Sequence, residues 1–432
     1  MFLVYDFVYA LALLVVWPLL LWRRWKRGPG SVALGERLGN VPSRPVSASC
    51  AWIHGVSLGE VNATRTLVAE LHRRNPELQI VISSTTGTGL DRARALYPKL
   101  TVFRFPLDFS FIHRRLLERI RPSVVVLMEL EAWPNLLEVA ARDELPVLIA
   151  NGRVTEDKSM RRFRNPLLRP IARRMFSKLR WVGAQEQVYA ERFVELGVPA
   201  ARVEITGSLK YDAADVADRI EGQDELASQM TIDRRRPLWV CGSTGPGEEA
   251  LILDVYAELQ RELPTLQLAI VPRKPERFQE VAELIASRGY ACLRRSGTPL
   301  VPRDVPEPRP VFLGDTMGEL RKFYALATVV FVGRSLVPMG GSDVMEVAGL
   351  GRPMLVGPFT ENFSEAVGLL TECGACRVVR DAGELRAQLA AWLGDEPGRR
   401  SAGVAGQQAI LSRRGATAKT VERILEFAAL GV

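Results

Sequence analysis

The sequence predicts an α/β protein with two doubly wound, Rossmann-like domains that face one another across a cleft, together with an N-terminal transmembrane helix. Three observations predict this. The 432-residue length exceeds the size at which a single core stops growing. Short apolar runs alternate with helical periods in two separate series, which is typical of parallel sheets covered by helices on both faces. The third observation is an apolar N-terminus.

Residues 1–22 are almost wholly apolar, broken only by Asp6 and Pro18, and a basic stretch follows at once. A run of this length can span a bilayer, and the order of charges is the reverse of that in a signal peptide. The positive-inside rule then places the remaining chain in the cytoplasm, with Asp6 near the outer end of the helix. The alternative is a helix that lies on the membrane surface. Residues 23–50 are expected to form a basic juxtamembrane segment.

The first domain is expected over residues 51–211. Its predicted strands are 51–56, 79–84, 101–105, 123–128, 146–150, 181–184 and 203–206, and helical periods occupy 61–74, 109–120 and 132–142. Residues 212–236 carry many charges and no clear strand, so they are expected to link the two domains.

The second domain is expected over residues 237–401. Its predicted strands are 238–241, 266–271, 311–313, 329–332 and 353–356, with helices over 248–263 and 275–287. Residues 402–432 have a helical pattern and are expected to form C-terminal helices.

Charge and composition limit the classes of partner that the protein is expected to bind. The net charge of +8 and the pI of 9.4 favour an anionic partner, while the low aromatic content disfavours nucleic acid. The basic run 161–178 is either a solvated helix face or a surface for anionic lipid heads. The five cysteines indicate no disulfide framework, and the lone Cys373–Cys376 pair predicts no metal site. A reducing compartment is expected.

The stretch from Trp52 to Glu60 ends an apolar run in a Gly-bearing loop, with a carboxylate where a helix begins. Ligands of open α/β sheets bind at the carboxyl ends of strands, where this loop would lie. Glu60 is therefore a candidate general base. The alternative is that Glu60 only complements the helix N-terminus.

Other loops of the first domain carry polar groups in comparable positions. Glu129 and Glu131 follow the 123–128 strand, and alternation would put both on one side if the strand continued. Asn151 and Arg153 follow the next strand. Lys210 closes the domain with a cation near the expected cleft.

The second domain has four loop-to-helix junctions that suit a nucleotide-linked ligand. The first, 242–249, offers backbone N–H groups to a phosphate but is not a Walker loop. Arg273 could grip a phosphate bidentately and Lys274 could act as a point charge, unless both belong to a solvated turn. The remaining two junctions, 314–319 and 340–346, each end in a Glu that could accept hydrogen bonds from sugar hydroxyls.

These motifs, in this order, resemble the 3-deoxy-D-manno-octulosonic acid (Kdo) transferases, the lipid A glycosyltransferases of family 30. The resemblance covers nearly the whole chain. It rests on the N-terminal anchor and on the motifs at 35–39, 54–60, 129–135, 151–153, 207–210, 242–244, 247–249 and 314–319.

The resemblance implies a GT-B fold and an inverting, metal-independent transfer that needs no cofactor. The donor would be CMP-Kdo and the acceptor a lipid A precursor, lipid IVA, at the cytoplasmic face of the inner membrane. By the same resemblance Glu60 is the general base and one of Glu129 and Glu131 is a second required acid. The expected acceptor-binding residues are Ser57, Gly59, Asn151 and Arg153. The expected donor-binding residues are Lys210, Ser243, Thr244, Arg273, Lys274, Gly314, Met317, Gly318, Glu319, Gly340, Gly341, Ser342, Asp343 and Glu346.

Three positions of the donor half depart from the family pattern, because Gly245, Lys274 and Ser342 stand where the family usually has histidine. These departures leave two alternatives open. One is a related transferase that uses another CMP-activated sugar or lipid acceptor. The other is a pseudoenzyme that binds lipid or nucleotide without turnover.

Overall fold

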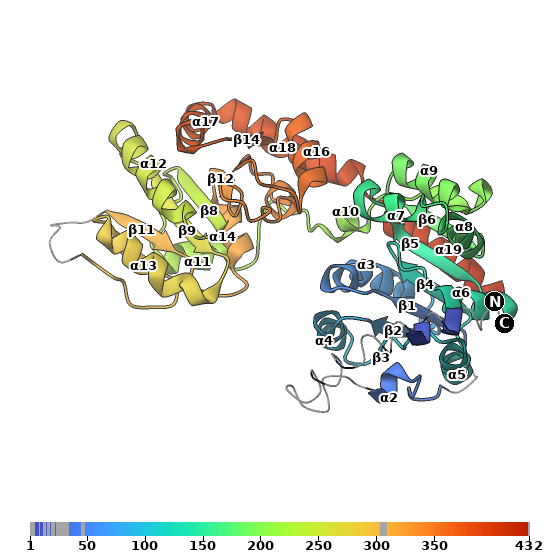
Figure 1. Cartoon of the computed structure of the whole chain (residues 1–432). Coiled ribbons are helices and arrows are strands. Elements are labelled where there is room, and N and C mark those ends of the chain that lie inside the picture. Colours follow the sequence, from blue (N-terminus) through green and yellow to red (C-terminus); the bar gives the residue numbers. More distant parts are fainter. Residues whose placement is uncertain are drawn as a thin grey trace. The chain divides into compact units, whose positions relative to one another are not determined.

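The computed structural model describes residues 34–44, 48–302 and 309–430, together with 5–7, 9–11, 14, 18 and 22. The chain divides into two compact units (Figure 1). The first comprises Met1–Ala213 and Arg413–Val432, and the second comprises Ala214–Ser412. The second unit is therefore inserted into the first.

The first unit is built on a seven-stranded parallel sheet with the order β3-β2-β1-β4-β5-β6-β7. Its strands are β1 (Cys50–His54), β2 (Gln79–Ser84), β3 (Thr101–Arg104), β4 (Val124–Met128), β5 (Val147–Gly152), β6 (Trp181–Ala184) and β7 (Val203–Ile205). Its helices and turns are α2 (Leu34–Arg37), α3 (Leu58–Arg74), α4 (Gly87–Leu96), α5 (Ser110–Ile120), α6 (Pro134–Arg142), η2 (Glu156–Met160), α7 (Arg161–Phe163), α8 (Arg169–Phe176), α9 (Gln187–Leu196), η3 (Ala200–Arg202), α10 (Leu209–Ala213) and α19 (Ala416–Leu430).

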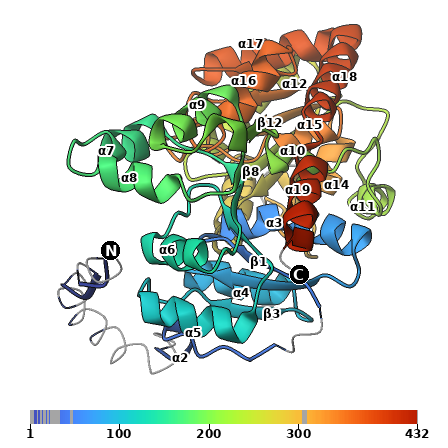
Figure 2. The same cartoon turned by 90° about the vertical axis from the view of Figure 1, so that its right-hand side faces the viewer.

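Successive side chains of the buried strands point to opposite faces of this sheet, so the first unit has two separate cores, one on each face. Val125 and Leu127 of β4 pack in one core with residues of α5, α6, α8 and α9. Val124 and Val126 pack in the other core with residues of α3 and α19. Because both faces are covered, every residue of the central strands β1 and β4 is buried. Figure 2 shows α5 and α6 beside this sheet.

The second unit repeats this architecture with the strand order β10-β11-β9-β8-β12-β13-β14, again parallel. The strands are β8 (Leu238–Thr244), β9 (Gln267–Pro272), β10 (Ala291–Arg294), β11 (Pro310–Leu313), β12 (Val329–Val332), β13 (Met354–Val356) and β14 (Cys376–Val378). The helices are α11 (Gln223–Gln229), α12 (Glu248–Glu262), η4 (Pro275–Arg277), α13 (Phe278–Ser287), α14 (Leu320–Leu326), α15 (Met345–Gly349), α16 (Ser364–Glu372), α17 (Ala382–Gly394) and α18 (Glu396–Ser412). The two-domain α/β architecture predicted from the sequence is confirmed.

Several elements differ from the prediction. The strands β10 and β14 lie at the sheet edges and are short, so their apolar signal is weak. The expected linker 212–236 contains α11 and belongs largely to the second unit. The C-terminal helical pattern is two helices, of which α18 stays with the second unit while α19 returns to the first. Cys373 and Cys376 are both free thiols.

The expected membrane anchor, residues 1–22, lies mostly outside the described residues. Within the part of the chain that the structure describes, no helix combines the length and apolarity needed to cross a bilayer.

Candidate active site

The first group of site residues lies at the topological switch point of the first sheet. The chain order reverses between the neighbouring strands β1 and β4, where His54 is in register with Leu127. A crevice forms where neighbouring strands send their connections to opposite faces. The loops after β1 and β4 carry Glu60, Glu129 and Glu131, so the predicted acids do gather at this edge.

Glu60 closes a capping box at the start of α3. Its Oε2 accepts a hydrogen bond from the N–H of Val56 at 2.8 Å. Its Oε1 accepts from the Ser57 hydroxyl at 2.8 Å and from the Ser57 N–H at 3.3 Å. Ser57 is the N-cap residue and its hydroxyl accepts in turn from the N–H of Glu60. The helix-capping role weighed for Glu60 is therefore real, but a carboxylate has about four lone-pair sites. Val56 is the only donor to Oε2 among the described residues, which leaves one lone-pair site of this oxygen for a further donor.

Glu129 and Glu131 form an acidic group with Glu60, although not by strand alternation. The strand ends at Met128, and Glu129 adopts a left-handed φ of 57°. Burial and the nearby Glu60 raise the pKa of Glu129. Burial, Glu60 and Glu129 together raise the pKa of Glu131 to about 7. Perturbed carboxyl groups of this kind are typical of functional sites.

Two cations balance this acidic group. Lys210 and Arg153 each lower the pKa of Glu129, opposing the effect of burial. Both belong to the first unit, so Lys210, which was expected to bind the donor, lies beside the acids. Asn151 positions these neighbours, because its Oδ1 accepts from the N–H of Leu209 at 3.0 Å. Asn151 itself has a φ of 55°, a conformation that Asn tolerates better than most residues.

A buried aromatic layer supports the acidic group, and the sequence analysis missed it. His54 stacks on Phe105 with ring centroids 4.0 Å apart, and Phe105 contacts Trp133 at 4.9 Å. Burial lowers the pKa of His54 to about 3, so the imidazole is neutral. Its Nδ1 lies 2.9 Å from the Ser83 hydroxyl. His54 therefore acts as a packing residue rather than as a proton carrier.

The second group of site residues lies at the equivalent switch point of the second sheet, between β8 and β12. Ser243 has a left-handed φ of 56°, a strained conformation that is common at ligand sites. The hydroxyls of Thr244 and Ser342 are buried and have no hydrogen-bond partner among the residues that the structure describes. A bound ligand could satisfy these two groups.

Two neighbouring acidic residues, Asp343 and Glu346, lie in the second unit. Burial raises the pKa of Glu346, the neighbouring Asp343 raises it further, and Arg321 and Arg273 oppose the rise. Glu346 is in the first turn of the short helix α15, as predicted. Arg273 itself is exposed, so it lies in a solvated turn while its charge acts on the pKa of Glu346.

Glu248 organises this site and was not singled out by the sequence analysis. Its fully buried carboxylate accepts from the N–H groups of Gly245 at 2.9 Å, Arg334 at 2.6 Å, Ser335 at 2.9 Å and Leu336 at 2.9 Å. These bonds join the loop after β8 to the loop after β12. A carboxylate four residues after a Gly-Ser-Thr sequence was the available signal.

Other predicted donor residues have different surroundings. Glu319 has its carboxylate held by Arg295, Thr316 and Lys322. Burial opposes these hydrogen bonds, yet together they lower the pKa of Glu319 to about 2. Met317 and Lys274 are exposed.

Two glycines in the site loops of the second unit, Gly245 and Gly340, are closely packed. A Cβ on Gly340 would lie 2.1 Å from Asn362, and the residue has a φ of 80°. A Cβ on Gly245 would lie 2.8 Å from the sulfur of Met339. Met339 therefore fills the volume that a side chain at position 245 would need. Gly341 lies in the same loop as Gly340, whereas Gly314 and Gly318 lie in the loop between β11 and α14.

The described residues include no group of three or more His, Cys, Asp or Glu side chains placed to hold a metal ion.

Comparisons with known proteins match these findings. Residues 33–213 match the family model of 3-deoxy-D-manno-octulosonic-acid transferases. The chain is 32% identical over 431 residues to a 3-deoxy-D-manno-octulosonic acid transferase of Haemophilus influenzae, covering 98% of both chains. It is 33% identical over 440 residues to the transferase of the same name in Bordetella pertussis, covering 97% of this chain and 99% of that protein.

Among solved structures, MurG of Acinetobacter baumannii matches with a TM-score of 0.54 at 14% identity, over 88% of this chain and 99% of that chain. At this identity the likeness concerns the fold alone. It agrees with the GT-B type of architecture expected from the sequence.

Proposed function

Because the chain belongs to the Kdo transferase family and is a glycosyltransferase, we propose that it transfers Kdo from CMP-Kdo to a lipid A precursor, lipid IVA. The observation that carries this proposal is the acidic group at the first switch point. The carboxylates of Glu60, Glu129 and Glu131 gather there, and Val56 is the only described residue that donates to Oε2 of Glu60.

Glu60 is proposed as the general base. The acceptor hydroxyl donates to Oε2 of Glu60, which takes the proton as the oxygen attacks the anomeric carbon of the donor. The bond to the CMP phosphate breaks at the same centre, which inverts its configuration. The backbone N–H of Val56 and the Ser57 N–H and hydroxyl hold the carboxylate in one orientation before the acceptor arrives.

Glu131 is proposed as the second acid. With a pKa of about 7, it carries a proton in about half of the molecules at neutral pH, so it can donate a hydrogen bond to an acceptor oxygen. Arg153 and Asn151 are proposed to bind the acceptor beside it. Ser57 and Gly59 belong to the same loop and helix start.

The donor is assigned to the second unit. Ser243, Thr244 and Ser342 present unsatisfied or strained groups, and the guanidinium of Arg273 would stabilise charge that develops on the leaving phosphate. Lys210 of the first unit is proposed to add a further positive charge. The reaction needs neither metal nor cofactor in this scheme.

A second candidate is transfer of another CMP-activated sugar. Gly245, Lys274 and Ser342 replace the histidines usual in the family, and Met339 occupies the space beside Gly245. The donor pocket therefore differs in shape and charge from the family pattern.

One assay tests both candidates. The full-length protein is incubated with CMP-Kdo and tetraacylated lipid A precursor, and products are read by mass spectrometry. Added Kdo that disappears in Glu60→Gln supports the proposal. Binding of CMP without product from CMP-Kdo, but with product from another CMP-sugar, supports the second candidate. Binding without any product indicates a pseudoenzyme.

The enzyme is proposed to work at the cytoplasmic face of the inner membrane, where its acceptor lies. The N-terminal segment would either cross the membrane once or lie in its surface.

A further inference from the structure

Two buried side-chain amides, those of Asn151 and Gln185, lie at the carboxyl ends of neighbouring strands in the first sheet. Asn151 belongs to the last turn of β5, and Gln185 comes directly after β6. Only 1% of Asn151 and 4% of Gln185 is exposed. The sequence analysis identified Asn151 but not Gln185.

Each amide is held at one end by a backbone group. Nε2 of Gln185 donates to the backbone carbonyl of Asn151 at 2.9 Å. Oδ1 of Asn151 accepts from the N–H of Leu209, the first residue of α10, at 3.0 Å. A backbone carbonyl can only accept and a backbone N–H can only donate. These two bonds therefore fix which end of each amide carries the oxygen, and they join the loops after β5, β6 and β7.

The other end of each amide has no partner. Nδ2 of Asn151 and Oε1 of Gln185 are buried, and no described residue forms a hydrogen bond with either atom. A buried polar group without a partner is costly, and in native proteins such a group calls for a water, an ion or a ligand. The amide pair thus offers one spare donor, on Asn151, and one spare acceptor, on Gln185.

The backbone at Asn151 departs from a regular strand. Where β5 pairs with β6, Ile149 is in register with Val182 and Gly152 with Ala184, so β5 carries one extra residue. Asn151 has a left-handed φ of 55°. A bulge re-aims the side chains of its strand, and here the amide of Asn151 meets Leu209 instead of following the alternation of the sheet.

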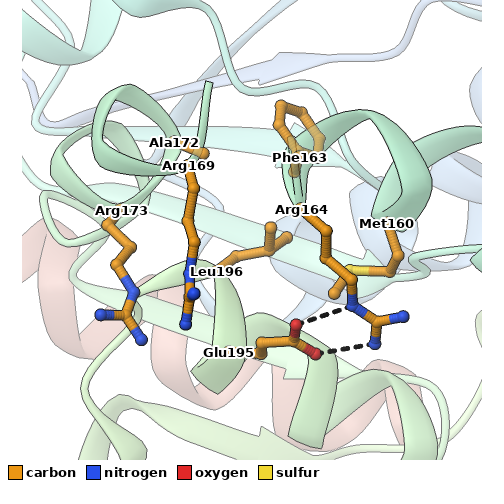
Figure 3. A pocket seen from close by; sticks show the side chains of 8 residues that line it. All are labelled: Met160, Phe163, Arg164, Arg169, Ala172, Arg173, Glu195 and Leu196. Atoms are coloured by element: carbon orange, nitrogen blue, oxygen red, sulfur yellow. Dashed lines mark hydrogen bonds and ion pairs between the residues drawn. The ribbon is translucent and has the colours of Figure 1, made fainter. Parts of the chain in front are cut away.

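The helix α9, which follows Gln185, is firmly attached to the first unit. Arg164 donates two hydrogen bonds to Glu195 of this helix, at 2.8 and 2.9 Å (Figure 3). Phe193 of the same helix packs against Gly152, where a Cβ would lie 2.8 Å from the ring. The backbone N–H of Gln185 also donates to the carbonyl of Gly152 at 3.0 Å. Gln185 is therefore fixed between a held helix and a strand.

The chemistry of the two spare atoms identifies the group that would satisfy both. A sugar hydroxyl donates one hydrogen bond and accepts others, so a single hydroxyl can pair with Nδ2 of Asn151 and Oε1 of Gln185 together. A carboxylate only accepts, and a phosphate near neutral pH offers mainly acceptor oxygens. Either anion would leave Oε1 of Gln185 without a donor.

The amide pair lies beside the acidic group but not within it. One strand, β5, separates β6 from β4, which corresponds to about 10 Å across the sheet. Lys210 follows Leu209 and lowers the pKa of Glu129, so the amide network extends to the acids. Lys210 is exposed and Arg153 is half-buried, so the surface begins next to the pair. We expect a shift of these long side chains to admit a bound molecule.

We propose that Asn151 and Gln185 bind a hydroxyl of the acceptor sugar other than the hydroxyl that attacks the donor, and that Gln185 is a specificity-determining residue. This inference rests on the proposed function, because it names the group that the acceptor presents to the first unit. The bound hydroxyl accepts from Nδ2 of Asn151 and donates to Oε1 of Gln185. Binding energy gained away from the reacting centre then holds the acceptor in place for Glu60.

Replacement of Gln185 by Met tests the pair, since Met keeps the length of the side chain and removes both polar ends. We expect kcat/KM for the acceptor to fall by about 10–100-fold, the effect of one unsatisfied buried partner, while KM for CMP-Kdo changes less than twofold.

The matched control is Gln267→Met in the second unit. Gln267 is also buried, but both of its ends are paired, with the N–H of Asp233 at 3.0 Å and its carbonyl at 2.8 Å. This variant should lower the melting temperature at least as much as Gln185→Met and leave KM for the acceptor unchanged. Equal losses of acceptor kcat/KM in the two variants would overturn the proposal.

Acceptor analogues that each lack one sugar hydroxyl identify the bound group. One analogue should lose about 10–100-fold in kcat/KM with the unmodified protein but less than about threefold with Gln185→Met, because the same hydrogen bond cannot be lost twice. If every analogue loses equally with both proteins, a buried water rather than the acceptor fills the pair, and the proposal is refuted.

Binding of the detergent-dispersed acceptor without any donor separates this proposal from the proposed function. In calorimetric titrations the full-length protein should bind the acceptor at least tenfold more tightly than Gln185→Met does, and Gln267→Met should bind like the unmodified protein. That result supports the amide pair even if CMP-Kdo gives no product. Kdo transfer together with equal binding by the unmodified protein and Gln185→Met would refute the amide pair alone.

Discussion

Replacing Glu60 by Gln separates the two roles of this residue. Gln has nearly the same shape, and a capping box accepts either Glu or Gln at this position. One oxygen remains as an acceptor, so the amide can keep the bond from Val56 or those from Ser57, but not all three. The amide cannot take a proton from the acceptor hydroxyl.

The two effects differ in size. Loss of part of the cap should lower the free energy of unfolding by about 0.5–1 kcal/mol, or about 1–4 °C in the melting temperature of a unit of this size. Loss of a general base should slow transfer by about 10²–10⁴-fold, which corresponds to about 3–5 kcal/mol in the activation barrier. Activity should therefore fall far more than stability.

The chain offers a matched control at the start of α17. Asp381 accepts from the N–H of Glu384 at 2.8 Å, and Glu384 accepts from the N–H of Arg380 at 2.8 Å. Glu384→Gln makes the same change in another cap and also removes the ion pair of Glu384 with the Arg380 guanidinium. Both variants are compared by thermal melting and by initial rates of Kdo transfer, followed by mass spectrometry.

Glu384→Gln should melt slightly earlier and transfer at the normal rate. The reasoning about Glu60 is refuted if Glu60→Gln keeps more than about a tenth of the normal rate, since general base catalysis contributes at least 10²-fold. A fall in melting temperature of more than about 8 °C would show that the cap, rather than proton transfer, dominates the effect.

Three further predictions follow from the buried polar groups. Folded Glu131 holds its proton up to about pH 7, whereas the carboxyl of the unfolded chain releases it near its ordinary pKa of 4.5. The free energy of unfolding should therefore fall as pH rises through this window. Glu131→Gln should flatten that fall in thermal melts between about pH 4 and 8, and an unchanged slope would contradict the raised pKa. Asn151→Ala leaves the buried N–H of Leu209 unpaired and should lower the free energy of unfolding by about 1–3 kcal/mol in urea titrations, whereas no change would mean that another group satisfies this N–H. Glu248→Gln places an amide against four N–H donors and should destabilise the second unit by about 3–5 kcal/mol. The control Glu280→Gln, at an exposed position, should cost less than about 1 kcal/mol. Similar losses of stability in the two variants would refute the role of Glu248.

The sequence predicted the parallel sheets well because their central strands are continuous apolar runs. The five residues of β4 are all buried, so no competing pattern exists there. The edge strands β10 and β14 are partly exposed, and the sequence did not predict them as strands. Periodicity also missed α4, whose first turn contains two glycines.

The site was predictable as a set of loops but not as a set of contacts. The acids at 60, 129 and 131 were identified by their place after strands. Their grouping depends on the left-handed turn at Glu129, which no local pattern predicts for Glu. The bonds of Asp6 to Ser110 and Asn135 span more than a hundred positions, so a hydropathy pattern could only read Asp6 as an interruption of an apolar run.

The path of the chain has a consequence for biosynthesis. Val421 and Ile424 of α19 are buried in the core of the first unit beside β1 and β4, yet they are translated after the whole of the inserted unit. The inserted unit, Ala214–Ser412, is complete before them and can fold while the ribosome is still at work. One face of the sheet of the first unit therefore stays uncovered until α19 has been made. A chain truncated near residue 412 would carry the complete inserted unit attached to a first unit whose sheet has one apolar face exposed.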